Sequence, residues 1–177
     1  YKGLLKIFKQ VGFQVGKSIT CHSTRVGAAV ALYENGENEI EIIPSSIGLL
    51  RNLHTLIVDS NKIQELPTSI GSCMQLRILS LANNQIKVLP DEIGRLASLK
   101  VLNLNSNSLK YLPFSLTKLT QLQAIWLSEN QNKPLIPLQS DVDPETGQKV
   151  LTCFLLPQLP FDNVNESSPK KISPRDD

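Results

Sequence analysis

The stretch LRILSLANNQIKVLPDEIG, residues 76–94, determines the fold because its pattern recurs through the chain at a fixed step of 23 residues. Three apolar residues, an asparagine and a leucine–proline pair return at the same spacing on both sides of it. The recurring columns are Leu53, Leu76, Leu99 and Leu122; Leu56, Leu79, Leu102 and Ile125; Val58, Leu81, Leu104 and Leu127; Asn61, Asn84, Asn107 and Asn130; and Leu66, Leu89 and Leu112, each followed by proline. Self-similarity at such a period indicates stacked structural repeats.

Each part of the repeat has a physical interpretation. Leu79 and Leu81 lie two residues apart, which is the period of a strand, so both face one side. Asn84 follows where the chain leaves that strand, and we expect its amide to face inward and bond backbone groups that no ladder satisfies. The Leu89–Pro90 step favours an extended or turn conformation over a helix. Each repeat therefore predicts one short parallel strand and one return segment.

These features predict an α/β fold: a right-handed leucine-rich-repeat solenoid with a parallel sheet on its concave side and a short helical or irregular convex side. We expect the repeats to cover residues 30–135. In the first of them Val30, Tyr33, Ile40 and Ile43 occupy the expected columns, but Asn35 stands where a core leucine is expected. One repeat cannot bury its own apolar face, so both ends of the array need caps.

The flanking segments differ from the repeats. Residues 1–29 form an atypical N-terminal segment whose first 20 residues place Leu4, Leu5 and Phe8 on one helical face; the alternatives are an amphipathic cap, a membrane-binding helix or no stable structure. Residues 136–160 form a C-terminal capping segment, in which 150–156 is an apolar run suited to a strand or a final coil. Residues 161–177 are polar and proline-containing, and we expect disorder there.

Composition narrows the function classes. The chain has 177 residues, 41% of them hydrophobic, and a net charge of +2, which argues against a nucleic-acid binder. No apolar run approaches the roughly 20 residues that a membrane helix needs. The three cysteines, Cys21, Cys73 and Cys153, are unpaired in number and far apart, which favours a reducing, intracellular compartment.

The sequence predicts no enzyme, no metal site, no cofactor and no small-molecule substrate. The segment from Gly12 to Gly16-Lys17-Ser18 has the wrong spacing for a phosphate-binding loop. Cys21-His22 is an isolated pair without ligand spacing. His22 and His54 are the only histidines, and no paired acidic or cysteine constellation surrounds either of them.

The outward positions of the expected strands are candidate protein-binding residues. They are Thr55, Ile57, Asp59, Ile78, Ser80, Asn83, Val101, Asn103, Asn105, Trp126, Ser128 and Glu129. We expect Ile57, Ile78, Val101 and Trp126 to share one column and form an apolar stripe across the sheet, which is typical of a partner contact. Two interpretations of Trp126 stay open: an interface anchor, or a side chain packed under the C-terminal segment.

The C-terminal segment resembles a known family. The relevant residues are 124–131 (AIWLSENQ), 133–139 (KPLIPLQ) and 149–158 (KVLTCFLLPQ). They are similar to the end of the repeat array and the following segment of the LAP family, the leucine-rich-repeat and PDZ proteins such as Scribble, Erbin and Densin. The resemblance covers about residues 36–160. The chain contains no PDZ domain, and residues 1–30 depart from the family's usual start.

The resemblance implies a non-enzymatic scaffold for cell polarity, junctions or synapses that binds other proteins through its concave face. It also implies a cytoplasmic location, peripheral at the basolateral, junctional or postsynaptic plasma membrane. The alternative is a Ras-suppressor-type regulator of small GTPase or phosphatase signalling, which would show plain repeats without the 131–160 segment.

Overall fold

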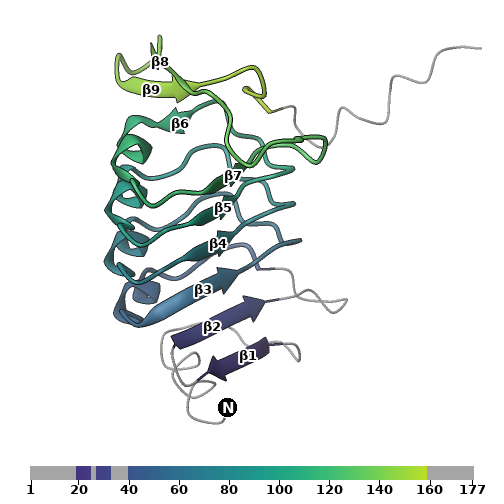
Figure 1. Ribbon diagram of the computed structural model, residues 1–177, viewed down its shortest axis with the longest axis vertical. Coiled ribbons are helices and arrows are strands. Elements are labelled where there is room, and N and C mark those ends of the chain that lie inside the picture. The colour runs from purple at the N-terminus through teal and green to yellow at the C-terminus, as the bar shows by residue number, and fades with distance from the viewer. Residues whose placement is uncertain (1–18, 25–26, 33–39, 159–177) are drawn as a thin grey trace, which may run out of the picture.

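The computed structural model describes residues 19–24, 27–32 and 40–158, which form a stack of coils with one long sheet along it (Figure 1). Sheet A has the strand order β1-β2-β3-β4-β5-β7. Its strands are β1 (Ile19–Thr24), β2 (Gly27–Leu32), β3 (Leu53–Ile57), β4 (Ile78–Ser80), β5 (Val101–Asn103) and β7 (Ala124–Trp126). From β2 onward neighbouring strands are parallel, one per coil. The expected parallel sheet is therefore confirmed.

The return side of each coil carries a short 3-10 helix, as the repeat pattern predicts. These helices are η1 (Ser45–Leu49), η2 (Thr68–Ser72), η3 (Asp91–Arg95) and η4 (Phe114–Lys118). Each begins directly after the proline of a proline-containing step; Pro90, for example, has φ −70° and ψ 147°. Proline fixes φ in this region and keeps the preceding residue extended, so the helix cannot begin earlier.

The core is a set of columns that run along the stack. Leu56, Leu79, Leu102 and Ile125 are in register across the sheet, and each is at most 1% exposed. This stacking confirms the shared interior that the repeat predicts. Cys73 belongs to the same core: its thiol donates to the Ile47 carbonyl at 3.3 Å, and burial raises its pKa to about 11.

Inward-facing asparagines join successive coils. The Asn84 side chain accepts from the Ile63 amide and donates to the carbonyls of Val58 and Leu81, all within 3.0–3.1 Å. Asn107 repeats the arrangement one coil later, toward Ile86, Leu81 and Leu104. Asn61 also lies in the interior, where it bonds the amide of Ile40 and the carbonyl of Val58. Three of the four expected asparagines thus satisfy buried backbone groups.

The prediction for Asn130 is wrong. Its side chain is exposed. Among the described residues Asn130 makes one hydrogen bond, from its backbone amide to the Ser128 hydroxyl at 3.3 Å. The position that Asn130 would fill in a fifth coil is occupied by Gln158 from the C-terminal segment. The fifth coil contributes only its strand, β7, and the chain leaves the repeat path directly after that strand.

Asn61, Asn84 and Asn107 form a row of inward-facing amides along the stack, the asparagine ladder. Gln158 continues this ladder at the C-terminal end. Its Oε1 accepts from the Leu109 amide at 3.0 Å, and its Nε2 donates to the carbonyls of Leu104 and Leu127, both at 2.9 Å. Its own amide donates to the Leu109 carbonyl at 2.8 Å. These are the same three kinds of contact that Asn107 makes one coil earlier. The C-terminal segment is therefore bonded to the solenoid interior at its last described residue.

A second glutamine covers the edge of sheet A. Gln131 accepts from the Leu127 amide at 3.0 Å and donates to the carbonyl of Ile125 at 2.6 Å. The Ile125 amide donates to the Pro134 carbonyl at 2.7 Å. These are the backbone groups that β7 would otherwise leave unpaired as an edge strand. The segment after β7 thus satisfies the edge without adding a strand to the sheet.

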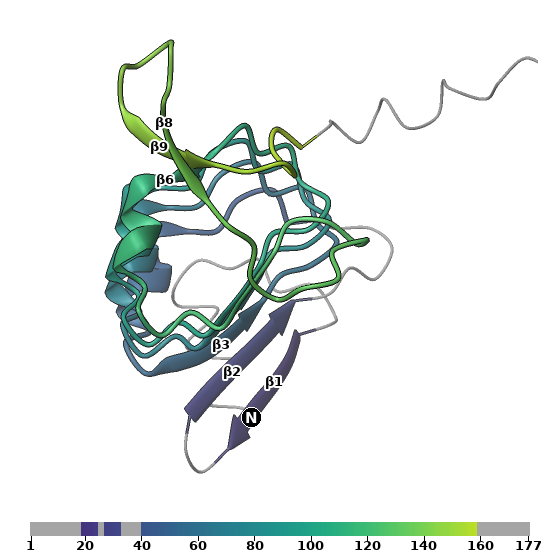
Figure 2. The same cartoon turned by 45° about the horizontal axis from the view of Figure 1, so that its top comes forward.

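A hairpin closes the same end of the stack on the side of the 3-10 helices (Figure 2). It consists of β8 (Gln139–Val142) and β9 (Lys149–Thr152), and β9 pairs with β6 (Leu112–Pro113) to form a three-stranded sheet. Val150, Leu151 and Leu156 are buried against the last coil. The apolar run at 150–156 therefore contains a strand that covers the exposed core, one of the two expected outcomes.

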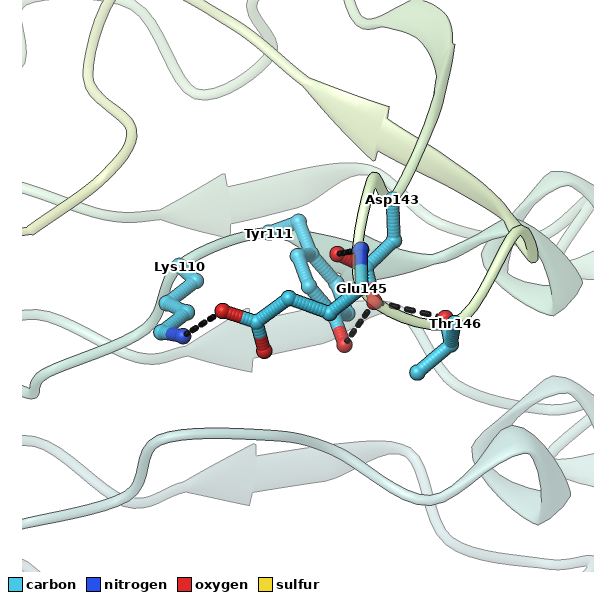
Figure 3. A network of polar contacts seen from close by, with 5 residues as sticks. All are labelled: Lys110, Tyr111, Asp143, Glu145 and Thr146. Carbon is cyan, nitrogen blue, oxygen red and sulfur yellow. Dashed lines mark hydrogen bonds and ion pairs between the residues drawn. The ribbon is translucent and has the colours of Figure 1, made fainter.

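Polar contacts hold the hairpin turn against the last coil (Figure 3). The Asp143 carboxylate accepts from the hydroxyls of Thr146, at 2.6 Å, and Tyr111, at 3.3 Å. The Thr146 hydrogen bond is the main reason that the pKa of Asp143 lies below its ordinary value. Burial, followed by the nearby Asp143 charge, raises the pKa of Tyr111. Lys110 and Glu145 add an exposed ion pair at 3.3 Å, a contact that is worth little in water.

The opposite end differs from the expected repeat. β1 and β2 form an antiparallel hairpin, and Val30 lies opposite Leu56 in β3, not opposite Leu53 as the 23-residue step predicts. Ile40 and Ile43 nevertheless occupy their expected places. The first coil therefore has more residues between its strand and its return segment than the later coils have. The expected boundary at residue 30 falls inside β2. The predictions for 1–18, Tyr33, Asn35 and 161–177 lie outside the described residues.

Glycine follows the buried isoleucine in three return segments because successive coils touch there. A Cβ on Gly48, Gly71 or Gly94 would lie 2.7, 2.6 or 2.5 Å from a carbonyl oxygen of the next coil. These separations are shorter than a carbon–oxygen contact allows. Thr117 stands at the same place in the last coil, where no further coil of the array approaches, and its hydroxyl donates to the Phe114 carbonyl.

We expect Gly71→Ala to lower the free energy of unfolding by about 2 kcal/mol, the usual cost of forcing an extra carbon into a packed site. The backbone of Glu92 must move to admit the methyl group. Urea denaturation followed by circular dichroism measures the change. Ser72→Ala, at the exposed neighbouring position, is the control and should stay within about 0.5 kcal/mol of the parent; equal stability of both variants would contradict the close packing.

Candidate functional site on the outer face of sheet A

The outer face of sheet A, opposite the core, carries four columns of side chains. The register places Thr55, Ile78, Val101 and Ala124 in one column, and Ile57, Ser80, Asn103 and Trp126 in the next. Further along the strand direction follow two columns at the 23-residue step: Asp59, Ala82, Asn105 and Ser128, then Ser60, Asn83, Ser106 and Glu129. The face is therefore mixed in character, with apolar side chains mainly in the first two columns.

The expected single apolar stripe is wrong. Ile57 and Trp126 belong to one column and Ile78 and Val101 to the other, because Ile57 pairs with Ser80 and Val101 pairs with Ala124. A residue that lies two positions further along a strand stays on the same face but belongs to the next column. Within their column, Ile57 and Trp126 are separated by Ser80 and Asn103. The apolar residues thus form separate contacts rather than a continuous band.

Ser80 is less accessible than a binding residue should be. It is 7% exposed, and its hydroxyl accepts from the Asn103 side chain at 3.1 Å. Asn103 is half-buried and also accepts from the Asn105 amide. Ser80 therefore positions the Asn103 side chain, and Asn103 is the residue of the two that a partner can reach.

The other candidate residues lie on the face or at its ends. Thr55, Ile57, Val101, Asn105, Trp126 and Ser128 are half-buried, and Ile78 is 38% exposed. Asp59 uses its carboxylate to accept from the Ala82 amide at 2.8 Å. Asn83 and Glu129 are exposed and contact hydroxyls of neighbouring coils, Ser60 and Ser106 respectively. These contacts join adjacent coils beyond the strand ends. Among the described residues, Ile78, Asn103 and Trp126 on the strands keep part of their surface accessible.

Three residues at the ends of the strands adopt a left-handed backbone. Ser60, Asn83 and Ser106 have φ values of 56°, 54° and 52°. Asparagine tolerates this region better than serine does. The conformation turns the chain away from the sheet, so it defines where the face ends.

Two positive residues beside the face were not among the candidates. Arg77 and Lys100 immediately precede Ile78 and Val101, lie in neighbouring coils, and are exposed. The Lys100 amide donates to the Arg77 carbonyl at 2.8 Å, which places the two residues side by side. Both residues precede the strands, where side chains begin to alternate between the core and the outer face. Choosing the outward residues of the strands therefore omits them. A search of all positions in the 23-residue register for clustered charge would have found them.

The described part of the chain holds no group of three histidine, cysteine, aspartate or glutamate residues that could bind a metal ion. His54 contacts the Asn52 carbonyl through Nδ1 at 2.8 Å. None of the described helices is long and apolar enough to cross a membrane.

A family model for leucine-rich repeat regions matches residues 68–140. The protein carries leucine-rich repeats. Its repeats supply β4, β5 and β7 of sheet A together with the return segments η2, η3 and η4, so the candidate face belongs to a leucine-rich-repeat solenoid. The finer resemblance to the LAP family remains an inference from residues 124–158.

Several solved leucine-rich-repeat structures are similar to parts of this chain. A leucine-rich-repeat protein from Leptospira interrogans is 41% identical over 50% of this chain and 22% of its own, with a TM-score of 0.48. The plant peptide hormone receptor RGFR1, solved with RGF2, is 37% identical over 49% of this chain and 15% of its own, with a TM-score of 0.46.

The ectodomain of the receptor kinase GASSHO1/SCHENGEN3 from Arabidopsis thaliana, solved with CASPARIAN STRIP INTEGRITY FACTOR 2, is 34% identical over 49% of this chain and 11% of its own, with a TM-score of 0.45. The match thus spans less than a quarter of the length of each of these three structures.

Proposed function

We propose that this protein is a non-enzymatic scaffold that binds a partner protein through the outer face of sheet A. The observation that carries the proposal is a set of accessible side chains on three neighbouring strands of that face. Trp126, Asn103 and Ile78 lie there on neighbouring strands and retain accessible surface. Aromatic side chains such as tryptophan are enriched in protein-binding surfaces.

The C-terminal segment supports a LAP-type scaffold. The residues of the resemblance include Gln131, Val150, Leu151 and Gln158, and these residues cover the sheet edge, fill the core and extend the asparagine ladder. We infer a role in cell polarity, junctions or synapses, with the chain in the cytoplasm and peripheral at the plasma-membrane cortex.

The second candidate is a Ras-suppressor-type regulator of small GTPase or phosphatase signalling. It uses the same repeats and the same face. It predicts plain repeats to the end of the array, whereas residues 131–158 form an edge cover, a hairpin and a ladder substitute. That segment favours the scaffold over the regulator.

We expect the Trp126→Ala and Ile78→Asp double variant to reduce partner binding at least about 30-fold, the equivalent of losing about 2 kcal/mol at an interface anchor. A photo-cross-linking amino acid at Asn103 should identify the partner in extracts of epithelial or neuronal cell cortex. The same probe at the exposed Thr117, on the side of the 3-10 helices, is the matched control.

Leu49→Asp introduces the same kind of charge at a residue in η1 that is 73% exposed, and it should leave binding unchanged. If the cross-linked protein were recovered equally from the Asn103 and Thr117 probes, or bound the double variant as tightly as the parent, the outer face would not be the binding surface.

A further inference from the structure

The beginning of the outer face carries two positive charges without partners. Arg77 and Lys100 are exposed, and neither makes an ion pair or a side-chain hydrogen bond with another described residue. Surface lysines and arginines often lie singly, but these two occupy the same repeat position in adjacent coils. Neighbouring parallel strands lie about 4.8 Å apart, so the two charges reinforce one another at the surface.

Charge is distributed unevenly along the strand direction. The first two columns of the face contain no carboxylate; the acidic residues on the face, Asp59 and Glu129, lie beyond the strand ends. Asp59 is also occupied by the Ala82 amide, and Glu129 contacts the Ser106 hydroxyl. A bound chain therefore meets positive potential at the start of the strands and weak negative potential at their ends.

The apolar part of the face adjoins the positive pair. Ile78 and Val101 follow Arg77 and Lys100 directly and pair with each other across β4 and β5. Ile78 is 38% exposed, so its side chain is accessible to a ligand on this face. A ligand that covers this column brings its neighbouring groups within reach of both cations.

We propose that the outer face binds an extended segment of a partner protein in which acidic residues accompany apolar ones. The acidic side chains bind Arg77 and Lys100, and the apolar side chains cover Ile78 and Val101. This inference rests on the proposed function, since it specifies the partner for the same face. Alternate residues of an extended chain lie about 6.6 Å apart, a separation that flexible lysine and arginine stems can span from adjacent coils.

A protein segment fits these residues better than an anionic membrane does. The cations adjoin a polar and aromatic sheet surface that includes Asn103 and Trp126. Beyond its bonds with Ser80 and Asn105, the Asn103 side chain keeps one N–H group and one acceptor lone pair, which suit the backbone of a peptide. A lipid surface would use the charges but not these amides.

The test is a selection of random peptides displayed on phage against the full chain, followed by affinity measurements on the selected peptides. Peptides from the parent protein should be enriched in aspartate and glutamate next to leucine, isoleucine or valine. The Arg77→Glu and Lys100→Glu double variant should bind them at least about tenfold more weakly, and binding should weaken as ionic strength rises.

Arg95→Glu with Lys118→Glu is the matched control. These two exposed residues also occupy one repeat position in adjacent coils, but they lie in η3 and η4 on the return side. The control should bind the selected peptides as tightly as the parent. Circular dichroism of all variants checks that the fold is intact.

Other outcomes separate this inference from the proposed function. If the selected peptides were neutral or basic, and their binding required Trp126 but not Arg77 and Lys100, the proposal of an acidic partner would be overturned. The proposed scaffold function would remain. Peptides that depend on no residue of the face would overturn both. Binding to vesicles of phosphatidylserine and phosphatidylcholine that requires Arg77 and Lys100, without any peptide selected, would assign the pair to a membrane and overturn the inference.

Discussion

Asn84→Leu is expected to lower the free energy of unfolding by about 3 kcal/mol, because the change leaves the buried Ile63 amide without a partner. An orphaned buried donor costs about 1–3 kcal/mol. The carbonyls of Val58 and Leu81 also lose a hydrogen bond, although Asn61 and Asn107 still donate to them. Leucine has nearly the shape of asparagine, so the loss is polar and not a packing defect.

Chemical denaturation gives the free energy, and hydrogen exchange of the Ile63 amide reports the local effect. The matched control is Asn130→Leu, which changes the same residue type at the same repeat position. Asn130 is exposed and its side chain makes no hydrogen bond with a described residue, so the control should lie within about 0.5 kcal/mol of the parent. Similar losses in the two variants would show that the cost does not come from the ladder.

The interior of the solenoid could be predicted from the sequence because every coil repeats the same local requirement. A residue such as Leu102 has equivalent neighbours, Leu79 and Ile125, on both sides, so the spacing alone determines its position. The same holds for the prolines before the 3-10 helices and for Asn84. Periodicity identifies positions whose environment is itself periodic.

The two ends could not be predicted in this way. At the last coil the next neighbour is missing, and its hydrogen bonds are made by Gln131 and Gln158, which lie at different distances along the chain. At the first coil, the register between β2 and β3 shifts and moves Val30 opposite Leu56. Both outcomes depend on contacts outside the repeat, where the 23-residue step has no information.

The candidate face was only partly predictable for a related reason. Alternation along a strand identifies which side chains point outward, Asn103 and Trp126 among them. Accessibility depends also on the neighbour in the next coil: Ser80 is covered because the longer Asn103 side chain bonds to it. Arg77 lies before the alternation starts, so a strand pattern does not include it.

Gln158→Leu, in the C-terminal segment that covers the last coil, is expected to lower the free energy of unfolding by a similarly large amount. The change removes the partners of the Leu109 amide and the Leu127 carbonyl, whereas the Leu104 carbonyl keeps its bond from Asn107. Two orphaned backbone groups correspond to a loss of about 3 kcal/mol, and the C-terminal segment is held less firmly as well. Gln139→Leu, at an exposed glutamine that begins β8, is the control and should have little effect.

Gln158→Glu separates hydrogen bonding from packing at this position. The carboxylate still accepts from the Leu109 amide, but it places negative charge against the carbonyls of Leu104 and Leu127, to which the amide group donates. We therefore expect Gln158→Glu to destabilise the last coil at neutral pH and to recover part of the loss in acid, where a protonated carboxyl group can donate.

Hydrogen exchange locates the effect of both variants. Exchange of the Leu109 amide should accelerate at least about tenfold in Gln158→Leu, because the free energy of local opening falls. The equivalent amides of Ile63 and Ile86 keep their asparagine partners, so they should change less. Unchanged protection at Leu109 would mean that the glutamine does not complete the ladder; acceleration confined to the last coil would show that a residue far along the chain provides the side chain that a fifth repeat would otherwise supply.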